Sequence, residues 1–121
     1  MITIVCGATA YLTDTASYIR DWRDMASKFP SALDVSNPEY KSLPPHGAFN
    51  LQEIRISIIL KRSTLPYRHL VAIKNQGAMS VAIRMVSPAE HFENLKAHVQ
   101  EIADTYEHRP STAYAAKLNA M

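Results

Sequence analysis

The side chains most often used in catalysis or metal binding are present in this chain but widely spaced. Cysteine occurs once, at Cys6, and the five histidines do not cluster in the sequence. His91 and His98 would lie about 10 Å apart along a helix, too far to share one metal ion. The acidic residues of the same region are spread around that helix rather than paired for acid–base catalysis. We therefore expect no metal, no cofactor and no catalytic residue, and we predict that the chain is not an enzyme.

The segment after the first apolar run is the nearest approach to a phosphate-binding motif. Cys6-Gly7-Ala8-Thr9-Ala10 follows a β-branched stretch, where a dinucleotide-binding fold places a glycine-rich turn. That turn needs further glycines so that the backbone can approach the pyrophosphate, and here Gly7 stands alone. We interpret Cys6 as a buried, unreactive side chain near the end of a strand.

Basic residues are concentrated in one part of the chain. Residues 51–86 hold six of the thirteen Lys and Arg residues but only one of the eleven Asp and Glu residues, Glu53. Because side chains alternate between the two faces of a strand, we expect these charges on the face opposite the helices. That face would be basic at its rim and apolar at its centre. Its predicted partner-binding residues are Arg55, Ile59, Lys61, Arg68, Leu70, Lys74 and Arg84.

Alternating and β-branched runs predict the strands that would carry this face. An N-terminal strand is expected at residues 2–6, and three more at about residues 51–61, 67–74 and 79–86. The short connections between the last three, including Asn75-Gln76-Gly77, predict an antiparallel meander. The proline-rich residues 30–50 are expected to form a loop, in which residues 32–35 could make a short edge strand.

Helical periodicity appears on either side of these strands. Thr13-Asp14-Thr15 supplies N-cap chemistry for an amphipathic helix that runs to about Phe29. Ser87-Pro88-Ala89-Glu90 has the pattern of a capping box and predicts a long helix with an apolar seam from Phe92 to Tyr106. The predicted fold class is therefore α+β. It has a mainly antiparallel sheet, made of the N-terminal strand and the meander, two helices packed on one face, and the order β-α-β-β-β-α.

Length and composition indicate a small globular domain. The chain has 121 residues, of which 47% are hydrophobic and 20% charged, as in ordinary globular domains. We expect one domain over residues 1–108 and a C-terminal tail, residues 109–121, that could form a short helix. No leader pattern and no apolar run of about 18 residues is found, so we predict a cytoplasmic protein with no membrane partner.

One segment resembles part of a known family. Leu43-Pro44-Pro45-His46-Gly47-Ala48-Phe49, followed by an alternating strand, is similar to the segment that opens the sheet of the double-stranded-RNA-binding domain. The α-β-β-β-α order of that family also matches residues 15–107. The family places lysines at the start of its last helix to bind phosphates, and this chain has Ser87-Pro88-Ala89-Glu90 there. The resemblance thus lacks its phosphate-binding residues.

The charge distribution favours a small non-enzymatic accessory module that docks an anionic partner through the predicted face. An acidic protein surface is preferred over nucleic acid, because no aromatic side chains are expected there to stack with bases. Two alternatives remain. The chain could be a homo-oligomeric subunit that assembles through the seam of the 92–106 helix, or a small enzyme with a site under the 30–50 loop.

Overall fold

A computed structural model of the chain describes the backbone of residues 1–108 and the side chains of residues 1–106. The predicted tail, residues 109–121, lies outside the described residues. The elements, in chain order, are β1 (Ile2–Ala8), α1 (Thr9–Leu12), α2 (Thr15–Ser27), β2 (Asp34–Val35), β3 (Glu39–His46), β4 (Phe49–Ile59), β5 (Thr64–Gln76), β6 (Met79–Pro88), the 3-10 turn η1 (Ala89–His91) and α3 (Phe92–His108).

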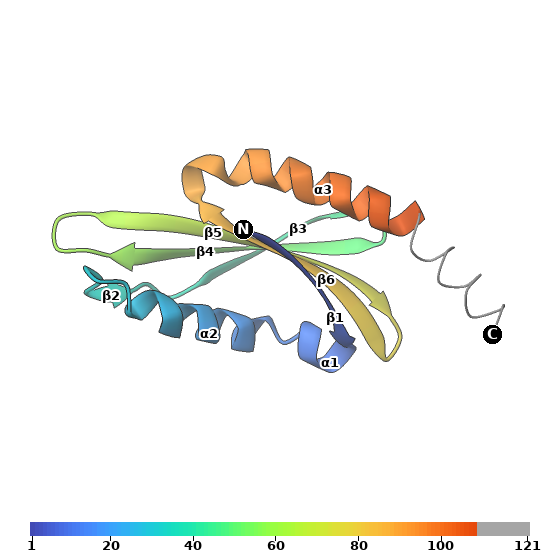
Figure 1. The fold of residues 1–121 in the computed structure, drawn as a ribbon, viewed down its shortest axis with the longest axis horizontal. Helices are drawn as coiled ribbons and strands as arrows, with labels where there is room; N and C mark the ends of the chain where they lie inside the picture. Colours follow the sequence, from blue (N-terminus) through green and yellow to red (C-terminus); the bar gives the residue numbers. More distant parts are fainter. Residues whose placement is uncertain (109–121) are drawn as a thin grey trace.

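The strands form one curled, antiparallel, six-stranded sheet. Its order is β1-β6-β5-β4-β2, and β3 also pairs with β4 (Figure 1). The predicted α+β class, the N-terminal strand and the β4-β5-β6 meander are therefore confirmed. The predicted element order is incomplete, because it lacked β3 and the short α1.

Part of the segment expected to be a loop is the strand β3, which pairs with β4 from Glu39↔Arg55 to His46↔Phe49. The pairing register shifts between Leu43 and His46, which is where Pro44 and Pro45 fall. Proline cannot donate to a β-ladder, and it is tolerated at an irregularity on an outer strand. Because the prolines of this segment indicated a loop, the strand β3 was not predicted.

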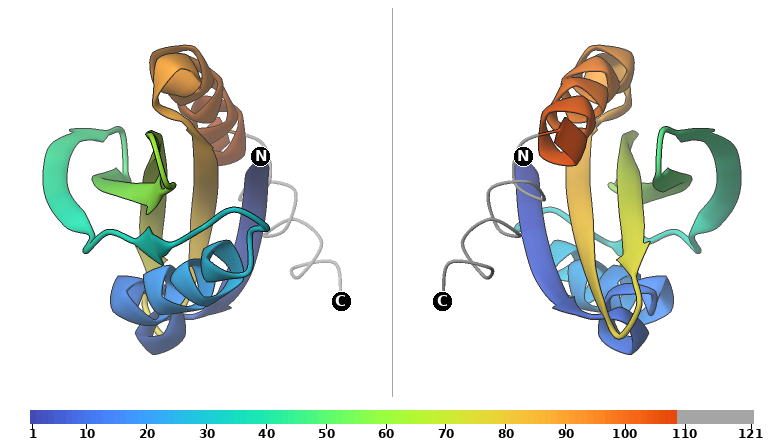
Figure 2. Two further views of the ribbon diagram at one scale, coloured as in Figure 1. Left: turned by 90° about the vertical axis from the view of Figure 1, so that its left-hand side faces the viewer. Right: turned by 90° about the vertical axis from the view of Figure 1, so that its right-hand side faces the viewer.

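The helices lie on both faces of the sheet, and the prediction that both pack on one face is wrong. Figures 1 and 2 show α3 on one side of the sheet and α1 and α2 on the other. The reason lies in the central strands, where Leu70-Val71-Ala72 and Val81-Ala82-Ile83 are buried at every position. A strand that is apolar on both faces needs a cover on each side.

The face under α3 holds the larger core cluster. Phe92, Val99 and Ala103 of α3 are at most 1% exposed, and they pack with Phe49 of β4 and Ile83 of β6. The predicted apolar seam of this helix is thereby confirmed. Its buried residues, such as Phe92 and Val99, are therefore not free to form the homo-oligomer interface considered above, whereas Ile102 and Tyr106 are only partly buried.

The opposite face is covered by α2. Ile19 and Ala26 of this helix are buried against alternate residues of β4, namely Ile54, Ile56 and Ile58. Asp14 caps α2, because its side chain accepts a hydrogen bond from the Ser17 N–H (3.1 Å). This cap agrees with the sequence prediction.

The start of α3 differs from its prediction. Ser87 belongs to β6 and is buried, and its hydroxyl donates to the Pro88 carbonyl (3.0 Å) instead of capping a helix. The turn η1 comes between this strand and α3. A pattern typical of a capping box thus coincides here with the end of a strand.

Candidate functional site

The seven predicted partner-binding residues do not share one open face. Arg84 points to the α2 side, where its guanidinium lies 4.6 Å from the ring centroid of Tyr18. The β5–β6 turn is the cause, because Gln76 pairs with Met79 and each even-numbered residue of β5 therefore lies opposite an odd-numbered residue of β6. Residues directly opposite each other in a sheet share a face. The expectation that Arg84 lies with Arg55 is wrong.

Burial removes a second part of the predicted surface. Leu70 is fully buried in the core cluster under α3, so it cannot be an exposed apolar centre. Lys74 shares the Leu70 face by strand alternation but lies near the far end of β5. Lys61 is exposed in the turn between β4 and β5. These positions do not surround a common surface.

Arg55 and Arg68 do remain together, on the part of the α3-side face beyond the start of α3. Ile59 shares their face by strand alternation but lies at the end of β4. Arg55 on β4 pairs directly with Arg68 on β5. Glu53, one strand repeat before Arg55, accepts a hydrogen bond from the Arg55 Nε–H (2.6 Å) and another from an Arg68 Nη2–H (2.6 Å). One carboxylate thus holds two guanidinium groups next to each other.

Glu53 is an unusual anchor because it is only 2% exposed. Burial raises the pKa of its carboxyl, but the hydrogen bonds and charges of Arg68 and Arg55 outweigh that effect, and the pKa is lowered overall. The carboxylate is therefore charged at neutral pH. A buried carboxylate of this kind stays ionised only while its cationic partners are in place.

The two arginines differ in what they leave available. Arg68 is mostly covered, with its guanidinium 3.9 Å from the ring centroid of Phe92 and 3.8 Å from the Glu93 carboxylate. The Arg55 side chain is 53% exposed. A guanidinium has five N–H donors, and in the described residues Arg55 gives only its Nε–H to Glu53. The Nε–H of Arg55 is thus held by Glu53, while its terminal N–H groups are left for another acceptor.

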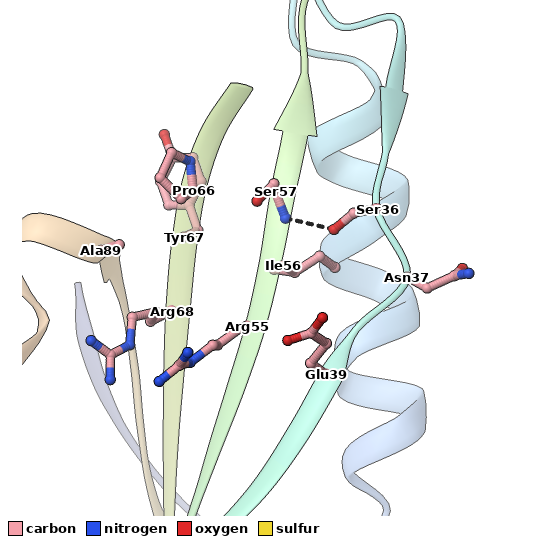
Figure 3. A pocket seen from close by; sticks show the side chains of 10 residues that line it. All are labelled: Ser36, Asn37, Glu39, Arg55, Ile56, Ser57, Pro66, Tyr67, Arg68 and Ala89. Carbon is pink, nitrogen blue, oxygen red and sulfur yellow. Dashed lines mark hydrogen bonds between the residues drawn. The ribbon is translucent and has the colours of Figure 1, made fainter. Parts of the chain in front are cut away.

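These arginines border a cleft of about 480 Å³ (Figure 3). Figure 3 shows their guanidinium groups side by side, with the Glu39 carboxylate facing Arg55 from β3. The residues that line the cleft are Ser36, Asn37, Glu39, Arg55, Ile56, Ser57, Pro66, Tyr67, Arg68 and Ala89. It therefore lies beside the 30–50 segment, and β2, β3, β4 and β5 all border it or lead into it.

The opposite wall of the cleft is polar and ordered. The Ser36 hydroxyl accepts a hydrogen bond from the Ser57 N–H (2.8 Å), which ties the end of β2 to β4. The ring of Tyr67, which also lines the cleft, packs against Trp22 on the α2 side, with centroids 5.6 Å apart. The lining thus combines guanidinium donors and hydroxyl groups with one carboxylate, that of Glu39, and the guanidinium donors suit a small anionic group.

A second polar cluster is buried under α2. The Nδ1 of His69, a residue that is 0% exposed, is 2.9 Å from the Tyr18 hydroxyl, and its ring lies edge-on to Trp22 with centroids 4.6 Å apart. His69 Nε2 and Arg84 Nε are buried without a hydrogen-bond partner among the described residues. Burial lowers the pKa of His69 to about 4 and raises that of Tyr18. This cluster is closed, and we assign it to stability.

Three further observations bear on the predicted chemistry. Cys6 is exposed, so the expectation of a buried cysteine is wrong; its Sγ lies 3.9 Å from the Tyr106 hydroxyl. In the part of the chain that the structure describes, no group of three or more His, Cys, Asp or Glu side chains is placed to hold a metal ion. The helices of this part include none both long and apolar enough to cross a membrane.

The cleft also contains residues that sequence reasoning missed. Ser36 and Asn37 lie in the segment expected to be a loop, whereas Glu53 and Ser57 lie in the strand predicted at residues 51–61 but are not among the predicted binding residues. The spacing Glu53-x-Arg55 was the available signal, because residues two apart in a strand lie on the same face. Comparisons of the chain with protein-family models, with curated proteins and with solved structures find no match.

Proposed function

We propose that the chain is a non-enzymatic binding module that holds an acidic side chain, or a terminal carboxylate, of a protein partner in the Arg55–Arg68 cleft. One observation carries the proposal: a buried carboxylate orients two neighbouring guanidinium groups at the mouth of a polar cleft. Orienting the donors in advance lowers the entropy lost when an anion binds.

The charges around the cleft favour a protein carboxylate over nucleic acid. Glu39 lines the cleft and Glu93 lies next to Arg68, so a continuous polyanion would meet negative charge on both sides of the arginines. A single carboxylate can approach Arg55 without passing them. Tyr67 is the one aromatic residue among those that line the cleft, and its ring already packs against Trp22, so the cleft lacks the series of rings on which successive bases stack.

The test is a titration of the uniformly ¹⁵N-labelled chain with a capped peptide that carries a single glutamate, followed by NMR. Shifts should concentrate on the backbone of residues 36–39, 55–57 and 66–68. Arg55→Gln should weaken binding by about tenfold, because it removes the accessible charged donor. Arg20→Gln is the matched control, since Arg20 is an exposed arginine on α2, away from the cleft.

Equal loss of affinity in both variants would indicate non-specific charge attraction and would refute the proposal. A parallel titration with single-stranded oligo-dT separates the partner classes. Tighter binding of the oligonucleotide, with an affinity that falls steeply with salt, would assign the cleft to nucleic acid instead.

A further inference from the structure

The first strand forms one edge of the sheet, and among the described strands it pairs only with β6. Figure 2 places β1 at one side of the sheet and β3 at the other. An edge strand presents unpaired N–H and C=O groups, and proteins normally protect such an edge with charges, prolines or irregularities.

The two edges are protected very differently. The outer strand β3 carries Glu39, Lys41, Pro44 and Pro45, together with a register irregularity. By contrast, β1 reads Ile-Thr-Ile-Val-Cys-Gly-Ala, with no charge and no proline, and pairs with β6 over seven residues without a shift. The β1 edge is therefore suited to accept another strand.

The hydrogen bonds at the two ends of β1 show which backbone groups face outward. The Val86 N–H donates to the Met1 carbonyl (3.0 Å), and the Thr9 N–H donates to the Ala78 carbonyl (2.8 Å). Because antiparallel pairing uses every second residue, the odd-numbered residues of β1 bond to β6. Ile2, Ile4, Cys6 and Ala8 then direct their N–H and C=O groups to the open edge.

An apolar groove runs beside the same edge. It has a volume of about 360 Å³ and is lined by Ile4, Glu101, Ile102, Thr105 and Tyr106. Ile4 is 49% exposed even though it belongs to a regular strand. Ile4 and this groove lie on the α3 side of the sheet, next to the open edge. A strand added at that edge would place further apolar side chains beside Ile4.

We propose that β1 pairs antiparallel with β1 of a second copy of this chain, which joins the two sheets into one. An uncharged strand is complementary to itself, since a two-fold axis places the same apolar and small residues on both sides without like-charge repulsion. The axis also brings both grooves to one face, where Ile4 of each copy is covered. Glu101 is exposed and lies 3.7 Å from His98, so its carboxylate can stay in solvent.

The test combines mass with amide exchange on the full chain. Light scattering at about 10–100 µM should give twice the chain mass, a concentration range suited to a modest interface. Hydrogen exchange should show slow amides at Ile4 and Cys6, which β6 does not protect, as well as at Thr3 and Val5, which it does.

Ile4→Lys should give a monomer. In it, the backbone amides of residues 4 and 6 should exchange quickly, while those of Thr3 and Val5 stay protected by β6. Leu33→Lys is the matched control, because Leu33 is 68% exposed and lies outside β1, and it should remain a dimer. A monomeric wild-type chain overturns the proposal, and slow Ile4 and Cys6 amides in such a monomer would assign the edge to another part of the same chain. A dimer that survives Ile4→Lys, or is lost in Leu33→Lys, also overturns it.

Discussion

Acidification should destabilise this protein through His69 before it affects the carboxylates. The imidazole is fully buried beside Trp22 and Tyr18, and burial lowers its pKa to about 4 from the ordinary value of 6.5. The unfolded chain therefore binds a proton in a pH range where the folded chain does not. The free energy of unfolding keeps its full value above pH 6.5 and falls as the pH is lowered toward 4.

The size of this loss follows from the two pKa values of His69. One pKa unit corresponds to 1.36 kcal/mol, so linkage predicts a loss of about 2 kcal/mol between pH 7 and pH 5, and about 3 kcal/mol by pH 4. Glu53 acts in the same direction but later. Its lowered pKa protects stability above about pH 4.5, and that contribution is lost only as the pH falls through the folded value.

Urea titrations at half-unit steps from pH 7.5 to 4 would measure the effect. Trp22 is the single tryptophan of the chain and lies against His69, so its fluorescence reports unfolding of this face. His69→Gln is the matched variant, because its amide can still bond to Tyr18 but does not titrate. The difference between the two pH profiles isolates His69, since all other titratable groups are the same in both proteins.

We expect the wild-type profile to fall below the His69→Gln profile by about 2 kcal/mol between pH 7 and pH 5, after the two are aligned at pH 7. Parallel profiles would refute the reasoning. They would mean that the imidazole is hydrated or is protonated without cost in the folded protein.

Three further changes test the fold and the anchor of the cleft. Glu53→Gln should lower the free energy of unfolding by about 3 kcal/mol, measured by urea titration, because it removes the buried carboxylate that bonds the mostly covered Arg68, whereas the exposed Glu101→Gln should cost under 0.5 kcal/mol. Val99→Ala should cost about 2–4 kcal/mol in the same assay, since it opens a cavity under α3; a cost near zero would contradict the α3-side core. Ser87→Ala should leave helix content by circular dichroism unchanged, because Ser87 caps no helix, and a loss of helicity would restore the capping-box interpretation.

Element type could be predicted from local pattern for most of the chain, because the longer helices and most strands carry their own period; β3, with Pro44 and Pro45, and the short α1 are the exceptions. The meander, α2 and the seam of α3 lie close to where the sequence predicted them. The error in layering arose at Leu70-Val71-Ala72 and Val81-Ala82-Ile83, which were interpreted as alternating although they are apolar throughout. A continuous apolar run indicates a strand covered on both faces. An interpretation of these two runs as strands covered on both faces would have predicted one helix on each side of the sheet.

The candidate site was less predictable because it depends on register. The positions of Arg55 and Arg68 followed from the β4–β5 pairing, in which Ile54 lies opposite His69 and faces stay as predicted. The position of Arg84 depended on whether the next turn had two or three residues. A one-residue difference in turn length moves every side chain of the following strand to the other face. Local sequence does not fix that choice at Asn75-Gln76-Gly77.

The covered sheet explains why binding would be concentrated at its margins. With α3 on one face and α2 on the other, the described surface leaves the Arg55–Arg68 cleft at the β4 side and the uncharged edge at β1. The strand β6 lies between β1 and the strands β4 and β5 that border the cleft. Pairing through β1 would therefore leave both clefts of a dimer open, at opposite ends of the joined sheet. Two clefts held at a fixed separation would favour a partner with two acidic segments, because the second segment binds at an effective concentration set by the first.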